Sequence, residues 1–308
     1  MKYLEFYKKR GLKENQVFDY FMGNIRTSIK TWDYFINWDK VNRGVDKVKI
    51  ELNILNSLIW ADNLEEEFVA LIQEYPKVIR VFPILLAVRE SRLEILKNYK
   101  ELNLNYDIFD FETNKKIEGK EARNYFTFIE KSGLIQLFEN KKIKNFVDYV
   151  FGAEVGLDSN GRKNRGGTLM ENIVEAFIKD FSEKHTDIHY ISQANSHSIK
   201  KAWGIGVKFD KSSRSYDFAV FNSKTEKLFL IETNFYNGGG SKLKSVCGEF
   251  KTLFRDLEKQ GINLIWITDG KGWETTKRPL EESFNQIDYL FNLNMLQDGI
   301  LREILIGR

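Results

Sequence analysis

The sequence is poor in cysteine, in proline and in long apolar runs. Its single cysteine, Cys247, has no partner for an internal disulfide and cannot build a multi-cysteine zinc site. The best apolar run, 78–88, is interrupted by Arg80 and Pro83 and is too short to cross a bilayer. The first residues, MKYLEFYKKRG, lack the uninterrupted apolar stretch of a secretion signal. These absences exclude a disulfide scaffold and a membrane span, and we expect a soluble protein of the reducing cytoplasm.

What the chain does contain is enough apolar material for a core and an uneven distribution of charge. Apolar residues make up 42% of the 308 residues, a length that predicts two domains or one elaborated domain. The net charge is only +3, but basic residues gather in three segments: 162–165, 200–214 and 242–244. Solvated loops and a nucleic-acid surface both explain such clusters.

The first half of the chain has the pattern of helices, and the second half that of a sheet crossed by helices. Apolar periodicity predicts helices over 61–75, 78–92, 126–138 and 143–150. Strands are predicted over 189–193, 216–221, 227–235 and 263–268, with a helix over 242–260. We therefore expect an α/β protein with a mainly helical N-terminal region over 1–150 and a mixed-sheet domain over 151–308.

The segment between these halves, 152–167, is rich in glycine, asparagine and basic residues. This composition predicts an irregular loop. Thr168 followed three residues later by Glu171 matches a capping box, which would open a helix with one apolar face. Glu171 is therefore either a cap partner or an acid that reaches the active site from this helix.

Two acidic residues lie on neighbouring predicted strands. Asp217 is near the start of one strand, and Glu232 is fifteen residues later, near the end of the next. If the two strands form an antiparallel hairpin, these carboxylates become neighbours, and Asn234 projects from the same face as Glu232. Paired carboxylates suit Mg²⁺, which prefers oxygen ligands. The alternative is that Asp217 is a turn residue and Glu232 an ion-paired strand residue.

The order and spacing of these residues resemble the motif of a known family. Asp217 followed by Glu232-x-Asn234 is similar to the PD-(D/E)xK nuclease arrangement, whose third residue is usually lysine. The stretches VDYVFGAEVGLDSNGRKNRGGTLMENIVEAF, YDFAV, LIETNFYNGGGSKL, WITDGKGW and IELNILNSLI resemble type II restriction endonucleases of the DpnII/MboI kind. The resemblance implies a PD-(D/E)xK nuclease-like mixed sheet flanked by helices, whose helical N-terminal region supports DNA binding or dimerisation.

The same resemblance implies an activity and partners. It implies Mg²⁺-dependent cleavage of double-stranded DNA at 5′-GATC-3′, before the G, by a homodimer. Methylation of the adenine would block cleavage, so that the host would carry a matching adenine methyltransferase. The alternative function is a non-catalytic, sequence-specific DNA-binding regulator on a nuclease-like scaffold, which would have no use for a carboxylate pair.

The resemblance also assigns roles to individual residues. Asp217 and Glu232 would hold the metal, and Asn234 replaces the usual lysine, so that Lys242 is a second candidate for orienting the attacking water. A phosphate contact explains Lys242 equally well. The residues expected to contact DNA are Arg162, Lys163, Arg165, Tyr236, Asn237, Lys242 and Lys244.

Overall fold

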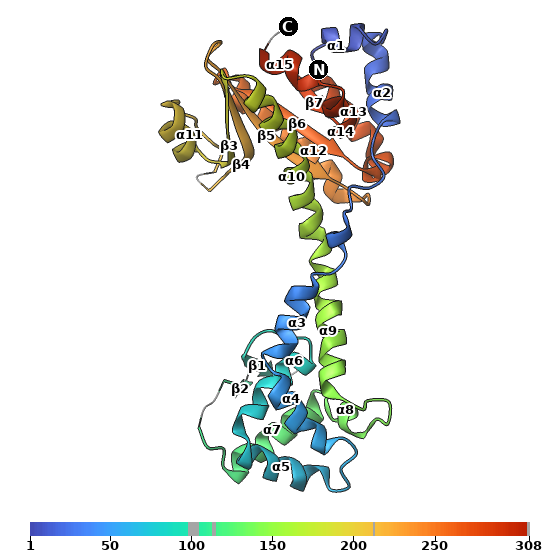
Figure 1. Ribbon diagram of the computed structural model, residues 1–308, viewed down its shortest axis with the longest axis vertical. Helices are drawn as coiled ribbons and strands as arrows, with labels where there is room; N and C mark the ends of the chain where they lie inside the picture. Colours follow the sequence, from blue (N-terminus) through green and yellow to red (C-terminus); the bar gives the residue numbers. More distant parts are fainter. Residues whose placement is uncertain (98–104, 113–114, 212, 307–308) are drawn as a thin grey trace. The chain divides into compact units, whose positions relative to one another are not determined.

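The chain folds into two compact units. The structure, a computed structural model, describes residues 1–97, 105–112, 115–211 and 213–306. One unit, called here the sheet unit, contains Met1–Thr31 and Lys163–Arg308, and the other, the helical unit, contains Trp32–Arg162 (Figure 1). This division differs from the expected boundary at residue 150, because the first 31 residues fold with the C-terminal half. Within the described ranges, no helix is long and apolar enough to cross a membrane.

The sheet unit is built on a five-stranded mixed sheet with the order β3-β4-β5-β6-β7. Strands β3 to β5 are antiparallel, whereas β5 to β7 are parallel. The bounds are Ile188–Ala194 for β3, Tyr216–Asn222 for β4, Lys227–Phe235 for β5, Asn263–Asp269 for β6 and Tyr289–Phe291 for β7. The predicted mixed sheet and its first four strands are confirmed, and only the three-residue β7 was not expected.

Helices cover both faces of this sheet (Figure 1). The helices of this unit are α1 (Glu5–Lys8), α2 (Val17–Gly23), α10 (Arg162–Lys184), α11 (Ser196–Trp203), α12 (Ser241–Glu258), α13 (Lys277–Gln286), α14 (Leu293–Gln297) and α15 (Ile300–Ile306). Ser192 bonds to Glu175 of α10, and Trp266 stacks on Phe250 of α12. Since the strand register puts Ser192 and Trp266 on opposite faces, α10 and α12 also lie on opposite faces.

A buried carboxylate adds a polar link to the apolar contacts that join the N-terminal segment to the sheet unit. Asp269, at the end of β6, accepts hydrogen bonds from the backbone N–H of Arg26 at 2.5 Å, Gly270 at 2.7 Å and Leu293 at 3.0 Å. Burial raises the pKa of Asp269, and these bonds act in the opposite direction. Asp269 thus ties the N-terminal segment and the start of α14 to the sheet.

The helical unit is made mainly of short helices with their own apolar core. Its elements are α3 (Trp38–Asp46), α4 (Lys49–Leu55), α5 (Leu64–Glu74), α6 (Phe82–Leu85), β1 (Arg92–Leu96), β2 (Tyr106–Asp110), α7 (Gly119–Lys131), α8 (Ile135–Glu139) and α9 (Phe146–Asn160). The predicted helix over 78–92 is wrong: a 3₁₀ helix over Pro76–Val81 leads into the short α6, and Ala87 then takes a positive φ of 58°. The hairpin of β1 and β2 was not expected.

The predicted loop over 152–167 is also wrong. The first half of this segment belongs to helix α9, and its second half belongs to α10. Only Gly161 between them is a turn residue, and its φ of −68° and ψ of −12° are helical values. The buried residues of α9 are Phe146, Val150, Glu154 and Asp158, spaced by four. Because two of these four are acids, the helical period is hidden in the sequence. Both acids are paired, Glu154 with Arg89 at 2.6 Å and Asp158 with the N–H of Asn37 at 2.8 Å.

Candidate active site

The hairpin predicted to join the two acids is present. The antiparallel pairs of β4 and β5 run from Asn222–Lys227 to Phe218–Ile231, so Asp217 and Glu232 are the next residues on the two strands. The side chain of Asp217 then continues the pairing, since its Oδ2 accepts from the N–H of Thr233 at 2.7 Å. The hydroxyl of Thr233 donates to the same oxygen at 2.8 Å. Asp217 is therefore fixed through one carboxylate oxygen.

The carboxylate of Glu232 lies in an electrostatically unfavourable place. Burial and then the charge of Asp217 raise the pKa of Glu232 well above its ordinary value. Burial also raises the pKa of Asp217, against the two hydrogen bonds from Thr233. In the described part of the chain, no group donates a hydrogen bond to Glu232 within the usual geometry. Two partly desolvated acids that repel one another fit a site that binds a cation.

Asn234 is held by the neighbouring strand. Its Oδ1 accepts a hydrogen bond of 2.9 Å from Nε1 of Trp266, a buried residue of β6. Trp266 is the register partner of Glu232, so that Glu232, Asn234 and Trp266 share the face covered by α12. Because the amide oxygen is used by the indole, the Nδ2 group of Asn234 is the part that can donate to a substrate or to water.

Glu171 lies inside α10 and does not cap it. The predicted capping box is wrong, because α10 begins at Arg162 and the hydroxyl of Thr168 donates to the carbonyl of Asn164, one turn earlier. Glu171 accepts a hydrogen bond of 3.0 Å from Nε2 of Gln193. Burial and the charge of Asp217 raise the pKa of Glu171, whereas the bond from Gln193 lowers it. Glu171 is therefore in electrostatic contact with the acidic pair.

Arg214 is a cation of this site that the sequence did not single out. Its charge lowers the pKa of Glu232, although burial and Asp217 outweigh it. The guanidinium is held between Asp210 and Glu249, with Nη2 of Arg214 donating to Oε1 of Glu249 at 2.9 Å. Sequence reasoning placed Arg214 in a basic loop, and the signal that could have distinguished it is its position two residues before β4.

The glycine-rich segment 236–240 packs closely against the segment after β6. A Cβ atom added to Gly239 would lie 1.8 Å from the hydroxyl of Thr275, and one added to Gly270 would lie 2.4 Å from the carbonyl oxygen of Tyr236. The absence of side chains here allows this contact within the protein. Tyr236 packs edge-on against Trp273, and burial raises the pKa of its hydroxyl to about 12.

Of the residues expected to contact DNA, three lie exposed beside this contact. Asn237 is in the glycine-rich segment, and Lys242 and Lys244 are in the first turn of α12. Lys242 is not among the main causes of the pKa shifts of Asp217 and Glu232.

The three remaining basic residues belong to the first turn of α10 and not to a loop. Nε of Arg162 donates to the carbonyl of Phe35 at 3.1 Å, and Arg165 is half-buried. The side chain of Lys163 lies outside the described part of the structure. Because Arg162 and Arg165 are three residues apart, they project from the same side of the helix.

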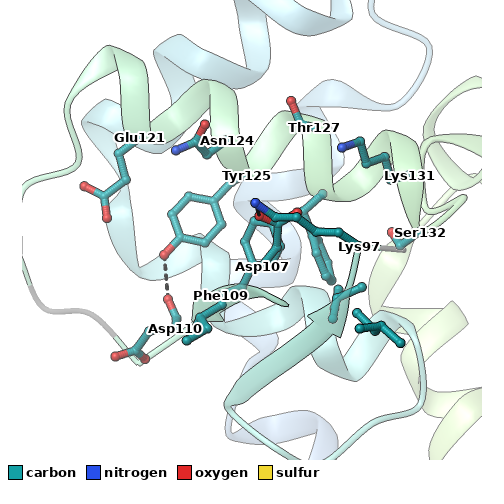
Figure 2. Close-up of a pocket in the computed structure, with 14 residues that line it drawn as sticks. Lys97, Asp107, Phe109, Asp110, Glu121, Asn124, Tyr125, Thr127, Lys131 and Ser132 are labelled. Carbon is teal, nitrogen blue, oxygen red and sulfur yellow. Dashed lines mark hydrogen bonds and ion pairs between the residues drawn. The ribbon is translucent and has the colours of Figure 1, made fainter. Parts of the chain in front are cut away.

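A sizeable cavity lies elsewhere, in the helical unit. It has a volume of about 850 Å³ and lies between the β1–β2 hairpin and α7 (Figure 2). Lys97 and Asp107 form an ion pair of 2.9 Å on one wall, and the Tyr125 hydroxyl donates to the carbonyl of Asp110 at 2.5 Å. None of the predicted site residues lines it. The candidate active site therefore lies outside this cavity.

The fold and the site together define an α/β protein with a coupled acidic pair at one end of an antiparallel strand pair. A model of the DpnII restriction endonuclease family matches residues 17–303. The type II restriction enzyme MjaIII of Methanocaldococcus jannaschii is 47% identical over 290 residues, covering 94% of this chain and 99% of that protein. The chain belongs to the DpnII restriction endonuclease family.

Two further relatives agree with this assignment. The type II restriction enzyme DpnII of Streptococcus pneumoniae is 34% identical and covers 95% of this chain and 100% of its own length. The type II restriction enzyme MboI of Moraxella bovis is 33% identical, and the match covers 92% of this chain and 94% of that protein. The chain is accordingly a type II restriction enzyme, a site-specific deoxyribonuclease, and these relatives favour an enzyme over a non-catalytic regulator.

Proposed function

We propose that this enzyme cleaves double-stranded DNA at 5′-GATC-3′, before the G, by Mg²⁺-dependent hydrolysis of a phosphodiester at Asp217 and Glu232. The observation that carries the site assignment is the electrostatic coupling of these two partly buried acids at the end of the β4–β5 pair. The order Asp217, Glu232, Asn234 along the hairpin supports a PD-(D/E)xK arrangement. The sequence specificity rests on the resemblance to the DpnII/MboI enzymes.

The residues of this site suit a hard divalent cation. Asp217 and Glu232 offer only oxygen donors, and one oxygen of Asp217 is already oriented by Thr233. Among the described residues, no group of three or more His, Cys, Asp or Glu side chains is arranged to hold a metal ion, so the proposed site rests on these two carboxylates. Mg²⁺ commonly binds through one or two carboxylates and leaves positions for phosphate and water. When bound, such an ion would stabilise the charge that grows on the phosphate and lower the pKa of bound water.

The other site residues then divide the remaining tasks. Asn234, fixed by Trp266, is the candidate for orienting the attacking water through its Nδ2 group. Lys242, exposed at the start of α12, is the candidate for a contact with the DNA phosphate or, alternatively, for the water-orienting role. Glu171 adds a third acid in electrostatic contact with Asp217.

The proposal includes a dimer and a host methyltransferase. A palindromic site is most simply read by two identical subunits, each of which cuts one strand. The helical unit would support DNA binding or dimerisation. Both the DNA substrate and a reducing setting for the buried thiol of Cys247 are found in the cytoplasm, where we place the enzyme.

Digestion of plasmid DNA with Mg²⁺, followed by sequencing of the ends, tests this proposal. We expect fragments whose ends map before the G of each GATC. Specific binding to GATC without any cleavage would instead identify the non-catalytic regulator, and cleavage at another sequence would refute the specificity.

Methylation of the site is expected to prevent cleavage. The N6 amino group of adenine lies in the major groove, and a methyl group there changes both its donor capacity and its shape. GATC carrying N6-methyladenine should therefore resist an enzyme concentration that digests unmethylated DNA completely. The measurement is a parallel digestion of the same plasmid with and without prior methylation, and equal digestion would contradict the prediction.

Neutralising the basic first turn of α10 is expected to weaken DNA binding. Replacing Arg162, Lys163 and Arg165 together by glutamine should raise Kd, and should flatten its dependence on salt because fewer counterions are released. Lys141, Lys142 and Lys144, which are exposed and have the same spacing, provide a control for the loss of three positive charges. If the α10 variant changes Kd and salt slope no more than this control does, the first turn of α10 does not contact the DNA.

The raised pKa values of the acidic pair predict that the metal requirement depends on pH. A cation binds the deprotonated carboxylates, so protons compete with it below the pKa of each acid. Burial raises the pKa of both acids, and the charge of Asp217 raises that of Glu232 further, so this competition begins at a higher pH than for exposed acids. The Mg²⁺ concentration for half-maximal cleavage should rise as the pH falls, by about tenfold per pH unit for each proton displaced. DNA binding in chelator, measured over the same pH range, is the control.

A further inference from the structure

Gln193 has a backbone conformation that is uncommon for a residue with a side chain. Its φ is +49°, in the left-handed region, although it lies within β3. The flanking pair Ser192–Phe218 continues the register so that Gln193 lies opposite Asp217. Strained backbone of this kind is maintained by its surroundings and is found most often at functional sites.

The consequence of this conformation is the direction of the Gln193 side chain. Ser192 donates from Oγ to Oε1 of Glu175 at 2.8 Å, and Gln193 donates from Nε2 to Oε2 of Glu171 at 3.0 Å. Adjacent residues of a regular strand point to opposite faces of the sheet. Here both side chains reach α10, where Glu171 and Glu175 are one turn apart. The left-handed residue therefore turns a side chain that would otherwise face away from Glu171.

Glu171 depends on this contact more than an ordinary surface acid would. Among the described residues, only the side-chain amide of Gln193 donates a hydrogen bond to the carboxylate of Glu171. The charge of Asp217 repels the Glu171 carboxylate, so without a donor this side chain is free to rotate towards solvent. We propose that Gln193 is a positioning residue, which holds the carboxylate of Glu171 within electrostatic reach of Asp217 for DNA cleavage. This inference rests on the proposed nuclease site.

Gln193→Asn tests the inference without disturbing the backbone. Asparagine accepts the left-handed conformation more readily than other residues with a side chain, but its shorter amide does not reach Glu171. We expect single-turnover cleavage of GATC DNA to fall by about tenfold to a hundredfold, as for residues that orient a metal-site ligand. The thermal unfolding temperature should stay the same or rise. Gln193→Gly, which relieves the strain altogether, should show the same split between rate and stability. Ser192→Ala, which removes only the neighbouring bond to Glu175, should keep the wild-type rate.

A double-mutant cycle separates positioning of Glu171 from a direct role. If Gln193 acts through Glu171, Gln193→Asn should cause no further loss in the Glu171→Ala background. A wild-type rate in Gln193→Asn, or an equal further loss in the Glu171→Ala background, would overturn the inference while the nuclease assignment stands. A wild-type enzyme that binds but never cleaves GATC DNA would overturn the proposed function, and this inference with it.

Discussion

Asp217→Asn and Glu232→Gln are each expected to reduce cleavage of GATC DNA by more than about a thousandfold, the upper end of the loss for one electrostatic group in an active site. Each substitution replaces a carboxylate that is proposed to hold the metal by a neutral amide of nearly the same size. Specific binding of DNA in the presence of chelator should survive, and it should tighten, since one negative charge that faces the phosphates is removed. The measurements are single-turnover cleavage with Mg²⁺ and equilibrium binding without it.

Both substitutions are chosen so that the fold is preserved. An asparagine at position 217 keeps an amide oxygen that can accept from the N–H and hydroxyl of Thr233. Burial and then the charge of Asp217 raise the pKa of Glu232, and Glu232→Gln removes both unfavourable effects, so the free energy of unfolding should increase at neutral pH. A variant that is more stable and binds DNA but does not cut it identifies a catalytic loss.

A control and a contrary outcome complete this test. Asp256→Asn removes an acid of α12 whose pair with Lys259, 3.2 Å away, is exposed, and it should cut DNA at the wild-type rate. Wild-type cleavage by Asp217→Asn would remove the proposed nuclease site from this hairpin.

The sheet could be predicted from the sequence because its strands carry the information locally. The range predicted for β5 is the observed one, Lys227–Phe235, since a strand buried on both faces has a continuous apolar run. The antiparallel pairing of β4 with β5 followed from the short connection between them. That pairing was enough to bring Asp217 and Glu232 to neighbouring positions.

The remaining parts of the fold depend on contacts between distant residues. The helical course of α9 is hidden because the partners of Glu154 and Asp158, which allow these acids to be buried, lie more than sixty residues away in sequence. The N-terminal segment joins the sheet unit through apolar side chains such as Phe18 and Phe21, which pack against Phe284, and through the backbone N–H of Arg26. The residue types alone do not show which distant segment they contact. Propensity and periodicity describe neighbours along the chain, so they do not report such contacts.

The supporting residues of the site were missed for a similar reason. Gln193 is significant because of its φ and its register opposite Asp217, neither of which is written in a single residue. Trp266 matters because β6 lies parallel to β5 with the indole beside Glu232 and Asn234. Charge-bearing residues on one hairpin could be found from spacing, whereas the side chains that orient them required the tertiary structure.

Asn234→Ala is expected to slow cleavage by about a hundredfold to ten-thousandfold if Asn234 orients the attacking water, as for other positioned proton-transfer groups. The variant also leaves the buried Nε1–H of Trp266 without its acceptor, at a cost of about 1–3 kcal/mol in stability. Asn234→Lys introduces the lysine that is usual in the PD-(D/E)xK arrangement proposed for this hairpin, but it loses the same acceptor, so its activity has to be judged together with its unfolding temperature.

Trp266→Phe separates the two roles of Asn234, because it removes the indole donor and leaves the amide in place. Trp266→Phe also leaves a cavity in the core, so it should lose at least as much stability as Asn234→Ala. If Asn234 only satisfies Trp266, Trp266→Phe should lose at least as much cleavage as well. If Asn234 orients water, Asn234→Ala should lose far more cleavage although it is the more stable variant. Lys242→Ala provides the competing outcome: slower single-turnover cleavage with unchanged GATC binding would assign the role to Lys242. A loss confined to binding would make Lys242 a phosphate contact, which agrees with its exposed place at the start of α12 and leaves the water to Asn234.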